Sequence, residues 1–380
     1  MDNEKIWLSS PHMGGDEMRY IQQAFDSNWI SPFGPNIDGL EKDLENYLGE
    51  GVHIAAVSSG TAALHLALTL LGVERDDIVI CQSFTFVASA NPIVYLGAVP
   101  VFVDSEEDTW NICPDALETA IKFCLSKGKK PKAIIAVCLY GMPYKIEDIK
   151  KISEKYEIPV IEDSAEALGS TYKGNKCGTF GDISIFSFNG NKIITTSGGG
   201  ALVLKNEKDK KKVIFLSNQA KDDAPHYQHS RVGYNYRLSN ISAGIGRGQM
   251  EVLHERLIQK KGNHNFYKSI FCKFVNIKLF TECNEDFKSN HWLNSITIEE
   301  NNFGIDCKSV RLELSKMNIE SRFLWKPMHL QPFFAKAKYF GTKVAENLFN
   351  SGLSLPSGTN LTDGDKEKID NAFRQIFKKI

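Results

Sequence analysis

Residues 187–200, SFNGNKIITTSGGG, place a single lysine, Lys192, in a glycine-rich connection between two largely apolar runs. The first run is 183–186 and the second is 201–204. Such surroundings are typical of a lysine that forms a Schiff base, because desolvation lowers the pKa of the amine and frees it to attack a carbonyl. A surface lysine in a hairpin loop would have a similar local sequence, so further segments must decide.

Acidic residues end a predicted buried strand in the segment 158–166, IPVIEDSAE. In α/β sheets, ligand-binding groups lie at the carboxyl ends of such strands. A carboxylate there, Asp163, can keep a pyridine nitrogen protonated, as in sites where a lysine holds pyridoxal phosphate. A helix N-cap after the strand would look the same, and Asp163 alone leaves both interpretations open.

A Ser/Gly/Thr turn before a helical pattern occurs in residues 57–68, VSSGTAALHLAL. The backbone N–H groups of a helix start, with Ser and Thr hydroxyls, form a phosphate-binding site. The Gly-Lys-Ser/Thr ending of a nucleotide-binding P-loop is missing. An ordinary capped strand–turn–helix unit would share these features. The phosphate site, the acid and the lysine, in this order on an α/β pattern, are far more specific together than any one of them.

Strand-like and helical segments alternate from about residue 53 to 204. The strand-like runs are 54–57, 78–81, 99–103, 133–138 and 160–162. This alternation predicts an α/β fold with a mainly parallel sheet covered by helices on both faces. A long helix that includes residues 253–257 leads out of this region, and the pattern after about residue 270 predicts a smaller α+β domain.

The composition is that of an ordinary globular protein, with 42% apolar and 24% charged residues among 380. The 45 Lys and Arg residues balance 46 Asp and Glu, so no overall basic field exists to hold nucleic acid or a membrane surface. No apolar stretch approaches the roughly 20 residues that span a bilayer, and no signal-peptide core is present. The eight cysteines form no CxxC pair, which disfavours a zinc site. We expect a cytoplasmic protein without a metal.

These three segments, together with GYNYRLSN at 233–240, resemble the DegT/DnrJ/EryC1/StrS sugar aminotransferases over about residues 6–356. The resemblance implies a pyridoxal phosphate (PLP)-dependent transferase fold of type I, with a mainly parallel seven-stranded sheet between helices. Residues 1–250 would form this large domain, and 251–380 the smaller one. The runs 8–15, 28–35, 83–86, 188–200 and 324–329 are similar to the branch that aminates C4 of UDP-2-acetamido-2,6-dideoxy-4-keto-hexose.

The resemblance also implies roles for single residues. Lys192 would hold the cofactor and move the proton, Asp163 would pair with the pyridinium nitrogen, and Glu166 would lie near the lysine or the cofactor's O3′. Further cofactor contacts are implied for the backbone N–H groups of Gly60 and Thr61 and the hydroxyl of Ser187 at the phosphate, and for Phe84 and Ala165 on the two ring faces.

Three further residues, all later in the sequence, are candidates for other contacts. In the family, the asparagine that matches Asn235 reaches the phosphate of the partner subunit's cofactor, which implies a homodimer with shared active sites. Arg237 and His329 are candidates for substrate contacts. An ordinary polar loop around Asn235 and Arg237, and a purely structural His329, would also fit the sequence.

The implied reaction is transfer of an amino group from glutamate to C4 of a UDP-linked 4-keto-6-deoxy-N-acetylhexosamine, for glycan or polysaccharide biosynthesis. An alternative is amination of a C3-keto nucleotide sugar linked to dTDP or UDP. Lys192 counts against a PLP sugar dehydratase, because that branch replaces the lysine. A non-catalytic homologue would have lost parts of the site, and a nicotinamide dehydrogenase would need GxGxxG at its first strand–helix turn.

One stretch departs from the expected pattern. Gly244, Gly246 and Gly248 crowd a segment that should be helical. Each interior glycine costs about 1 kcal/mol relative to alanine. Only close packing, such as at a subunit interface, would account for them.

Overall fold

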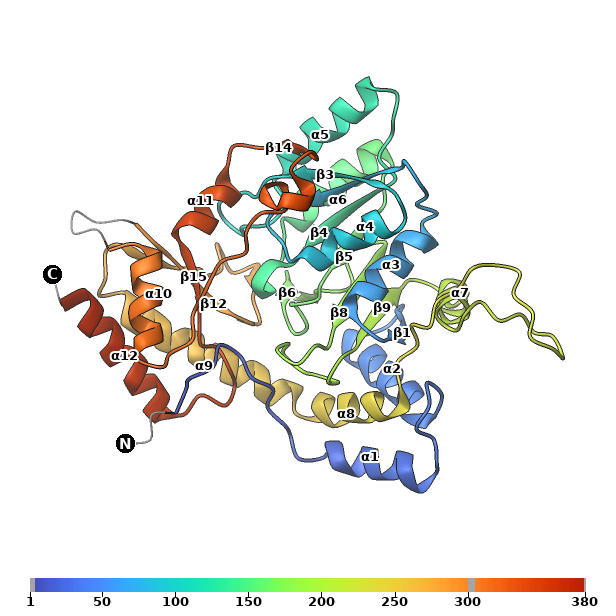
Figure 1. Ribbon diagram of the computed structural model, residues 1–380, viewed down its shortest axis with the longest axis horizontal. Helices are drawn as coiled ribbons and strands as arrows, with labels where there is room; N and C mark the ends of the chain where they lie inside the picture. The colour runs from blue at the N-terminus through green and yellow to red at the C-terminus, as the bar shows by residue number, and fades with distance from the viewer. Residues whose placement is uncertain (1–3, 300–304, 379–380) are drawn as a thin grey trace.

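Eight strands form the central sheet, and helices cover both of its faces (Figure 1). The computed structural model describes residues 4–299 and 305–378. In spatial order the strands are β1 (His53–Val57), β9 (Gly200–Leu204), β8 (Ile183–Ser187), β5 (Val160–Asp163), β4 (Ala133–Val137), β2 (Ile78–Gln82), β3 (Val99–Val103) and β14 (Lys338–Phe340). Strand β9 is antiparallel to both neighbours, and all other neighbouring pairs are parallel. The expected mainly parallel sheet is confirmed.

Side chains alternate between the two faces of the sheet, so both faces need helices. In β4, Ile135 and Val137 pack into one hydrophobic cluster, whereas Ile134 and Ala136 pack into the other. The first face is covered by α3 (Gly60–Leu70), α4 (Asn91–Tyr95) and α7 (Glu207–Ser217), and the opposite face by α2 (Pro35–Leu48), α5 (Pro114–Ser126) and α6 (Ile146–Tyr156).

The eighth strand of the central sheet comes from the C-terminal part of the chain. β14 pairs in parallel with β3, with Lys338 opposite Val101 and Phe340 opposite Val103. The family resemblance implied seven strands, and β14 is the eighth; a strand of three residues carries almost no periodic signal in the sequence. The C-terminal part therefore returns to the large sheet, and a domain boundary at residue 250 stays a prediction.

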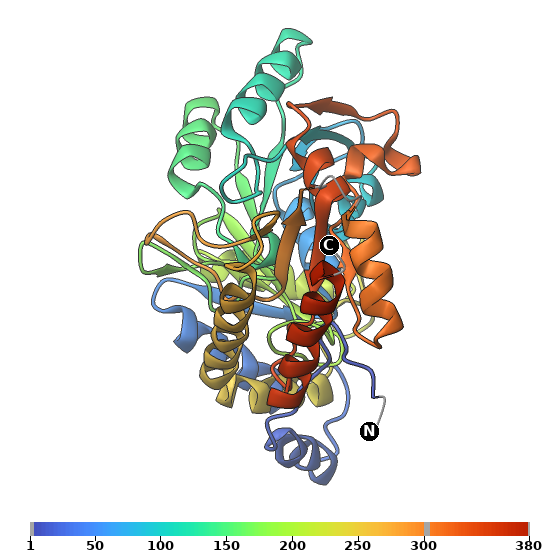
Figure 2. The ribbon, with the colours of Figure 1, turned by 90° about the vertical axis from the view of Figure 1, so that its left-hand side faces the viewer.

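A second, antiparallel sheet forms the core of the C-terminal part, the side of the molecule that faces the viewer in Figure 2. Its strands are β10 (Ile277–Leu279), β12 (Asn294–Ile298), β15 (Gly352–Leu355) and β13 (Arg322–Phe323). Around it lie α9 (Leu253–Phe271), α10 (Cys307–Lys316), α11 (Val344–Ser351) and α12 (Asp363–Lys378). A small sheet of β11 (Phe287–Lys288), β6 (Thr171–Tyr172) and β7 (Asn175–Lys176) joins the two parts.

The glycines of α8 (Asn240–Glu251) lie where it packs against α1 (Glu17–Asp26) and α2. A Cβ at Gly248 would be 2.7 Å from the backbone nitrogen of Glu17. A Cβ at Gly244 would be 2.9 Å from Nδ2 of Asn36, and one at Gly246 would be 2.8 Å from Cγ2 of Thr196. Close packing within one chain therefore explains these glycines, and no subunit interface is needed.

Gly248→Ala should lower the free energy of unfolding by about 1–2 kcal/mol. The gain in helix propensity, about 1 kcal/mol, is outweighed because the new methyl group must push the backbone of α1 away. Urea unfolding measures the effect. The control is Gly262→Ala in α9, where a Cβ would meet nothing within 4 Å, so this variant should gain stability. Equal gains in both variants would contradict the packing explanation.

Candidate active site

A cavity of about 540 Å³ opens where the end of β5, the start of α3 and the loop after β8 meet. Asp163, Gly60 and Lys192 come from these three elements and all line the cavity. The C-terminal part contributes Trp292 and Trp325 to the wall. The three segments singled out in the sequence thus converge, at the carboxyl ends of parallel strands where α/β folds bind ligands.

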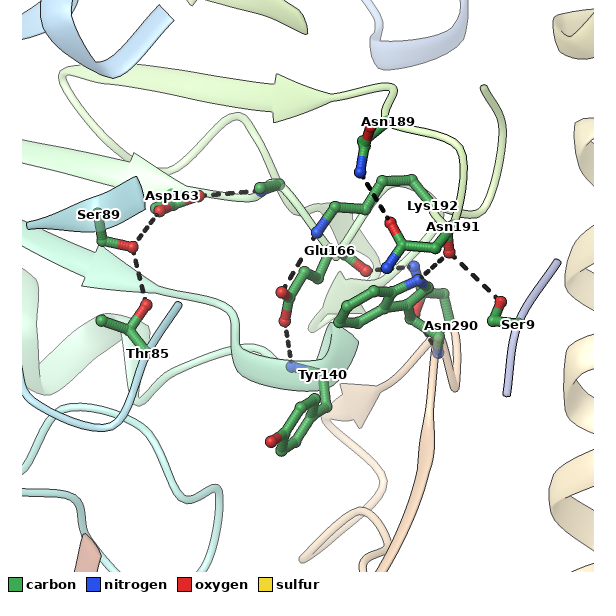
Figure 3. Close-up of polar contacts among 12 residues, drawn as sticks. Ser9, Thr85, Ser89, Tyr140, Asp163, Glu166, Asn189, Asn191, Lys192 and Asn290 are labelled. Atoms are coloured by element: carbon green, nitrogen blue, oxygen red, sulfur yellow. Dashed lines mark hydrogen bonds and ion pairs between the residues drawn. The ribbon is translucent and has the colours of Figure 1, made fainter. Parts of the chain in front are cut away.

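Lys192 faces Glu166 in this cavity (Figure 3). The lysine Nζ lies 3.3 Å from Oε1 of Glu166 and 4.1 Å from the centre of the Trp292 ring. The backbone N–H of Tyr140 donates to the other carboxylate oxygen, Oε2, at 2.7 Å. Burial raises the pKa of Glu166 to about 7, although Lys192 and the Tyr140 N–H act to lower it. Glu166 therefore titrates near neutral pH, beside the lysine amine.

Hydrogen bonds hold the carboxylate of Asp163 (Figure 3). Its Oδ2 accepts from the Ser89 hydroxyl at 2.7 Å, and its Oδ1 accepts from the backbone N–H of Ala165 at 3.2 Å. Burial raises the pKa of Asp163, and these two hydrogen bonds oppose the rise. A protonated ring nitrogen beside the carboxylate would favour its charged form. Asp163 is thus suited to pair with a pyridinium.

The start of α3 forms the phosphate cradle. The Ser59 hydroxyl caps the helix by accepting from the N–H of Ala62 at 3.0 Å. The N–H groups of Gly60 and Thr61 lie in the first turn, where a helix offers no carbonyl to accept them, and both residues line the cavity with Ser187. A Cβ at Gly60 would be 2.9 Å from Cβ of Ser187, so a larger residue would fill the cradle. These donors at a helix N-terminus fit a phosphate group.

Comparison with known proteins agrees with this arrangement. The model of the DegT/DnrJ/EryC1/StrS aminotransferase family matches residues 11–374. The chain belongs to this family. It is 47% identical to EpsN of Bacillus subtilis, by name a pyridoxal phosphate-dependent aminotransferase, over 100% of this chain and 97% of EpsN. It is 35% identical to the GDP-perosamine synthase of Caulobacter vibrioides, over 99% of each chain.

Solved structures support the same assignment. The sugar aminotransferase Spr1654 of Streptococcus pneumoniae, in its PLP form, superimposes with a TM-score of 0.90 at 28% identity, over 99% of each chain. The predicted fold type I, the PLP cofactor and the enzyme class are confirmed: this family member is a PLP-dependent sugar aminotransferase. The lysine, acid and phosphate cradle of its cavity fit that cofactor.

Phe84 does not reach the cavity of this aminotransferase, contrary to the prediction that it covers one cofactor face. Its ring is fully buried and packs edge-on against Tyr140, with the ring centroids 6.3 Å apart. Phe86 lines the cavity instead, and is 55% exposed. The chain turns after β2, so the two rings point in different directions. Ala165 lines the cavity, and its predicted contact with the ring stays a prediction.

Arg237 and His329, the predicted substrate contacts, lie outside the cavity lining. Nη1 of Arg237 is 2.6 Å from Oε1 of Glu41 and donates to the carbonyl of Ala56 at 2.9 Å. Nδ1 of His329 is 2.7 Å from the Ser83 hydroxyl. Both side chains are held by contacts within the chain, and a substrate contact for either stays a prediction.

Asn235 is exposed and does not line the cavity of its own chain. It pairs in an isolated bridge with Asn218. A contact with the cofactor of a partner subunit therefore stays a prediction.

Four supporting residues were not predicted from the sequence. The Ser89 hydroxyl donates to Asp163, and the backbone N–H of Tyr140 donates to Glu166. Tyr140 has a left-handed backbone conformation, with a φ of 53°. Asn290 donates to the carbonyl of Glu166 at 2.8 Å, and Trp292 lies under Lys192. Only Trp292 has a signal in the sequence, because it directly precedes the alternating run 293–298.

Glu166→Gln should change how the stability of the cofactor-free protein depends on pH. Because the folded protein has a raised Glu166 pKa, the carboxyl group stabilises the fold below its unfolded pKa of 4.5 and loses this contribution as pH rises through about 7. Between pH 4.5 and 7, the free energy of unfolding of the wild type should therefore fall by up to about 3 kcal/mol relative to that of the glutamine variant. Urea unfolding across this range measures it, and parallel curves would contradict the raised pKa.

Proposed function

We propose that this aminotransferase moves the amino group of glutamate to C4 of a UDP-linked 4-keto-6-deoxy-N-acetylhexosamine, for glycan or polysaccharide biosynthesis. The proposal depends on one observation: Lys192, Asp163 and the start of α3 surround a single cavity. The substrate choice is supported by the runs 8–15 and 188–200, which are similar to the C4 branch of the family.

Each residue of the cavity has a proposed role. When bound, PLP would supply an electron sink and an acceptor for the amino group. Lys192 would hold the cofactor through its amine, and the same Nζ would take up and return the proton of the substrate carbon. Asp163 holds the proton on the ring nitrogen, and Glu166 orients the lysine amine. Gly60 and Thr61 donate N–H groups to the phosphate.

Further cofactor contacts complete the proposal. The hydroxyl of Ser187 would also bind the phosphate. Ala165 would bound one face of the ring, and Phe86, rather than Phe84, the other.

The proposed partners are a nucleotide-linked keto-sugar, glutamate and a second copy of this chain that contributes Asn235. A balanced overall charge supports the absence of a nucleic-acid partner. Within residues 4–299 and 305–378, no helix has the length and apolarity to cross a bilayer. A cytoplasmic location stays a prediction.

A GDP-linked 4-keto-6-deoxyhexose is the second candidate substrate. GDP-perosamine synthases of three organisms are 35–37% identical to this chain over 98–99% of its length. These identities are lower than that of EpsN, whose name gives no sugar.

A single-turnover experiment separates the candidates. The protein is converted to its pyridoxamine phosphate form with glutamate, freed of the donor and mixed with UDP-2-acetamido-2,6-dideoxy-4-keto-glucose or with the GDP-linked ketone. Return of the PLP absorbance with the UDP sugar, and a product whose mass and NMR spectrum show an amine at C4, is the expected result. A response to the GDP sugar alone, or an amine at C3, would overturn the substrate assignment but not the enzyme class.

A further inference from the structure

A buried lysine that forms no ion pair with any described residue contacts Trp292, which lines the active-site cavity. Lys260, on α9, is 2% exposed. Its Nζ donates to two backbone carbonyls, that of Trp292 at 2.9 Å and that of Ser357 at 2.6 Å. In the part of the chain that the structure describes, Lys260 forms no ion pair, and burial alone shifts its pKa. Desolvation lowers the pKa of Lys260 to about 7.

The two carbonyls belong to segments that flank the second sheet. Trp292 precedes β12, and Ser357 follows β15. The backbone N–H of Asn294 also donates to the Ser357 hydroxyl, at 2.8 Å. Lys260 therefore joins both segments to α9, one just before β12 and the other just after β15.

Trp292 continues this connection into the cavity. Its indole Nε1–H donates to the carbonyl of Asn191 at 2.7 Å, next to the lysine in sequence. The ring centre lies 4.1 Å from Nζ of Lys192. The ring also stacks with Tyr140, whose N–H binds Glu166. Any shift of the Trp292 backbone would thus move the surface against which the Lys192 amine rests.

We propose that Lys260 is a positioning residue that sets Trp292, and through it the amine of Lys192. Stability alone does not explain a lysine here, because a methionine would fill the same space without the cost of desolvating a charge. Two hydrogen bonds from one amine fix two carbonyls at once, which a methionine cannot do. The inference rests on the proposed role of Lys192 as the attachment site of the cofactor.

The test measures the reactivity of Lys192 in cofactor-free protein, by acetylation at limiting reagent and mass spectrometry of the Lys192 peptide. Lys260→Met should change the labelling rate of Lys192 at least threefold, without lowering the melting temperature. Trp292→Phe should produce a change of similar size. The double variant should show no further change, since both act on one connection. Lys260→Arg, which keeps the charge and the donors, should restore the wild-type rate.

Tyr267→Phe is the matched control. Tyr267 lies on the same buried face of α9 and donates to the neighbouring carbonyl of Pro356 at 2.7 Å, but does not bond to Trp292. Its loss should leave Lys192 labelling unchanged. An unchanged rate in Lys260→Met, or effects of Lys260 and Trp292 that simply add, would overturn the proposal. If Lys260→Met fails to fold, unchanged labelling in Trp292→Phe would overturn it as well.

The proposed role of Lys192 is tested separately. With PLP bound, the Lys260→Met enzyme should keep its visible absorbance band but show a shifted pH transition of that band and a lower kcat. Absence of any such band in the wild type would refute the role of Lys192 in attaching the cofactor. The labelling result would then still test whether Lys260 positions Trp292.

Discussion

Lys192→Ala should lower aminotransferase activity by on the order of 10⁴-fold or more, because both the attachment of the cofactor and the proton transfer are lost. The fold should persist, since this side chain makes one ion pair, with Glu166, and one ring contact, with Trp292. Turnover with glutamate and the keto-sugar, the visible absorbance of bound PLP and circular dichroism together measure these effects.

Two further variants isolate the chemistry of the lysine. Lys192→Arg keeps a positive charge opposite Glu166 but lacks a free amine, so it should be as inactive as the alanine variant. Lys211→Ala, at a lysine that is 75% exposed on α7, should be fully active. Substantial turnover by Lys192→Arg would show that charge, and not the amine, is what the site requires.

Asp163→Asn should lower activity by about 10³-fold while PLP still binds. A neutral amide cannot keep the ring nitrogen protonated, so the electron sink is weakened, whereas the phosphate cradle at Gly60 is untouched. Because burial raises the pKa of Asp163, removing its charge should not destabilise the protein at pH 8. Steady-state kinetics and the melting temperature check both statements.

Ser89→Ala provides a graded control for Asp163. It removes the 2.7 Å hydrogen bond to Oδ2 and so raises the pKa of Asp163 further. Activity should fall by about 10-fold, with the larger loss at low pH, where the carboxylate is protonated first. A pH-independent loss would point instead to a packing defect.

Much of the large domain could be predicted because its elements have strong local patterns. The strand expected at 99–103 is β3 with those bounds. Weak elements were missed. β14 has three residues and joins the sheet only by pairing with β3.

The candidate site shows the same division. Asp163 and Gly60 each sit at a strand or helix end that the sequence marks, and both line the cavity; their cofactor contacts stay predictions. Phe84 was misassigned because the sequence does not show the direction in which a ring points after a turn. Arg237 and His329 were expected at the substrate, but their partners Glu41 and Ser83 lie far away in sequence.

The sequence by itself determined the chemistry: a lysine in a glycine-rich loop, an acid at a strand end and a phosphate cradle at a helix start. Each of these is a local feature, formed by residues that are close together in the sequence. Only the tertiary structure decided what surrounds the amine of Lys192. Trp292 and Lys260 come from the C-terminal part and meet it through packing and hydrogen bonds between distant segments, which no local pattern encodes.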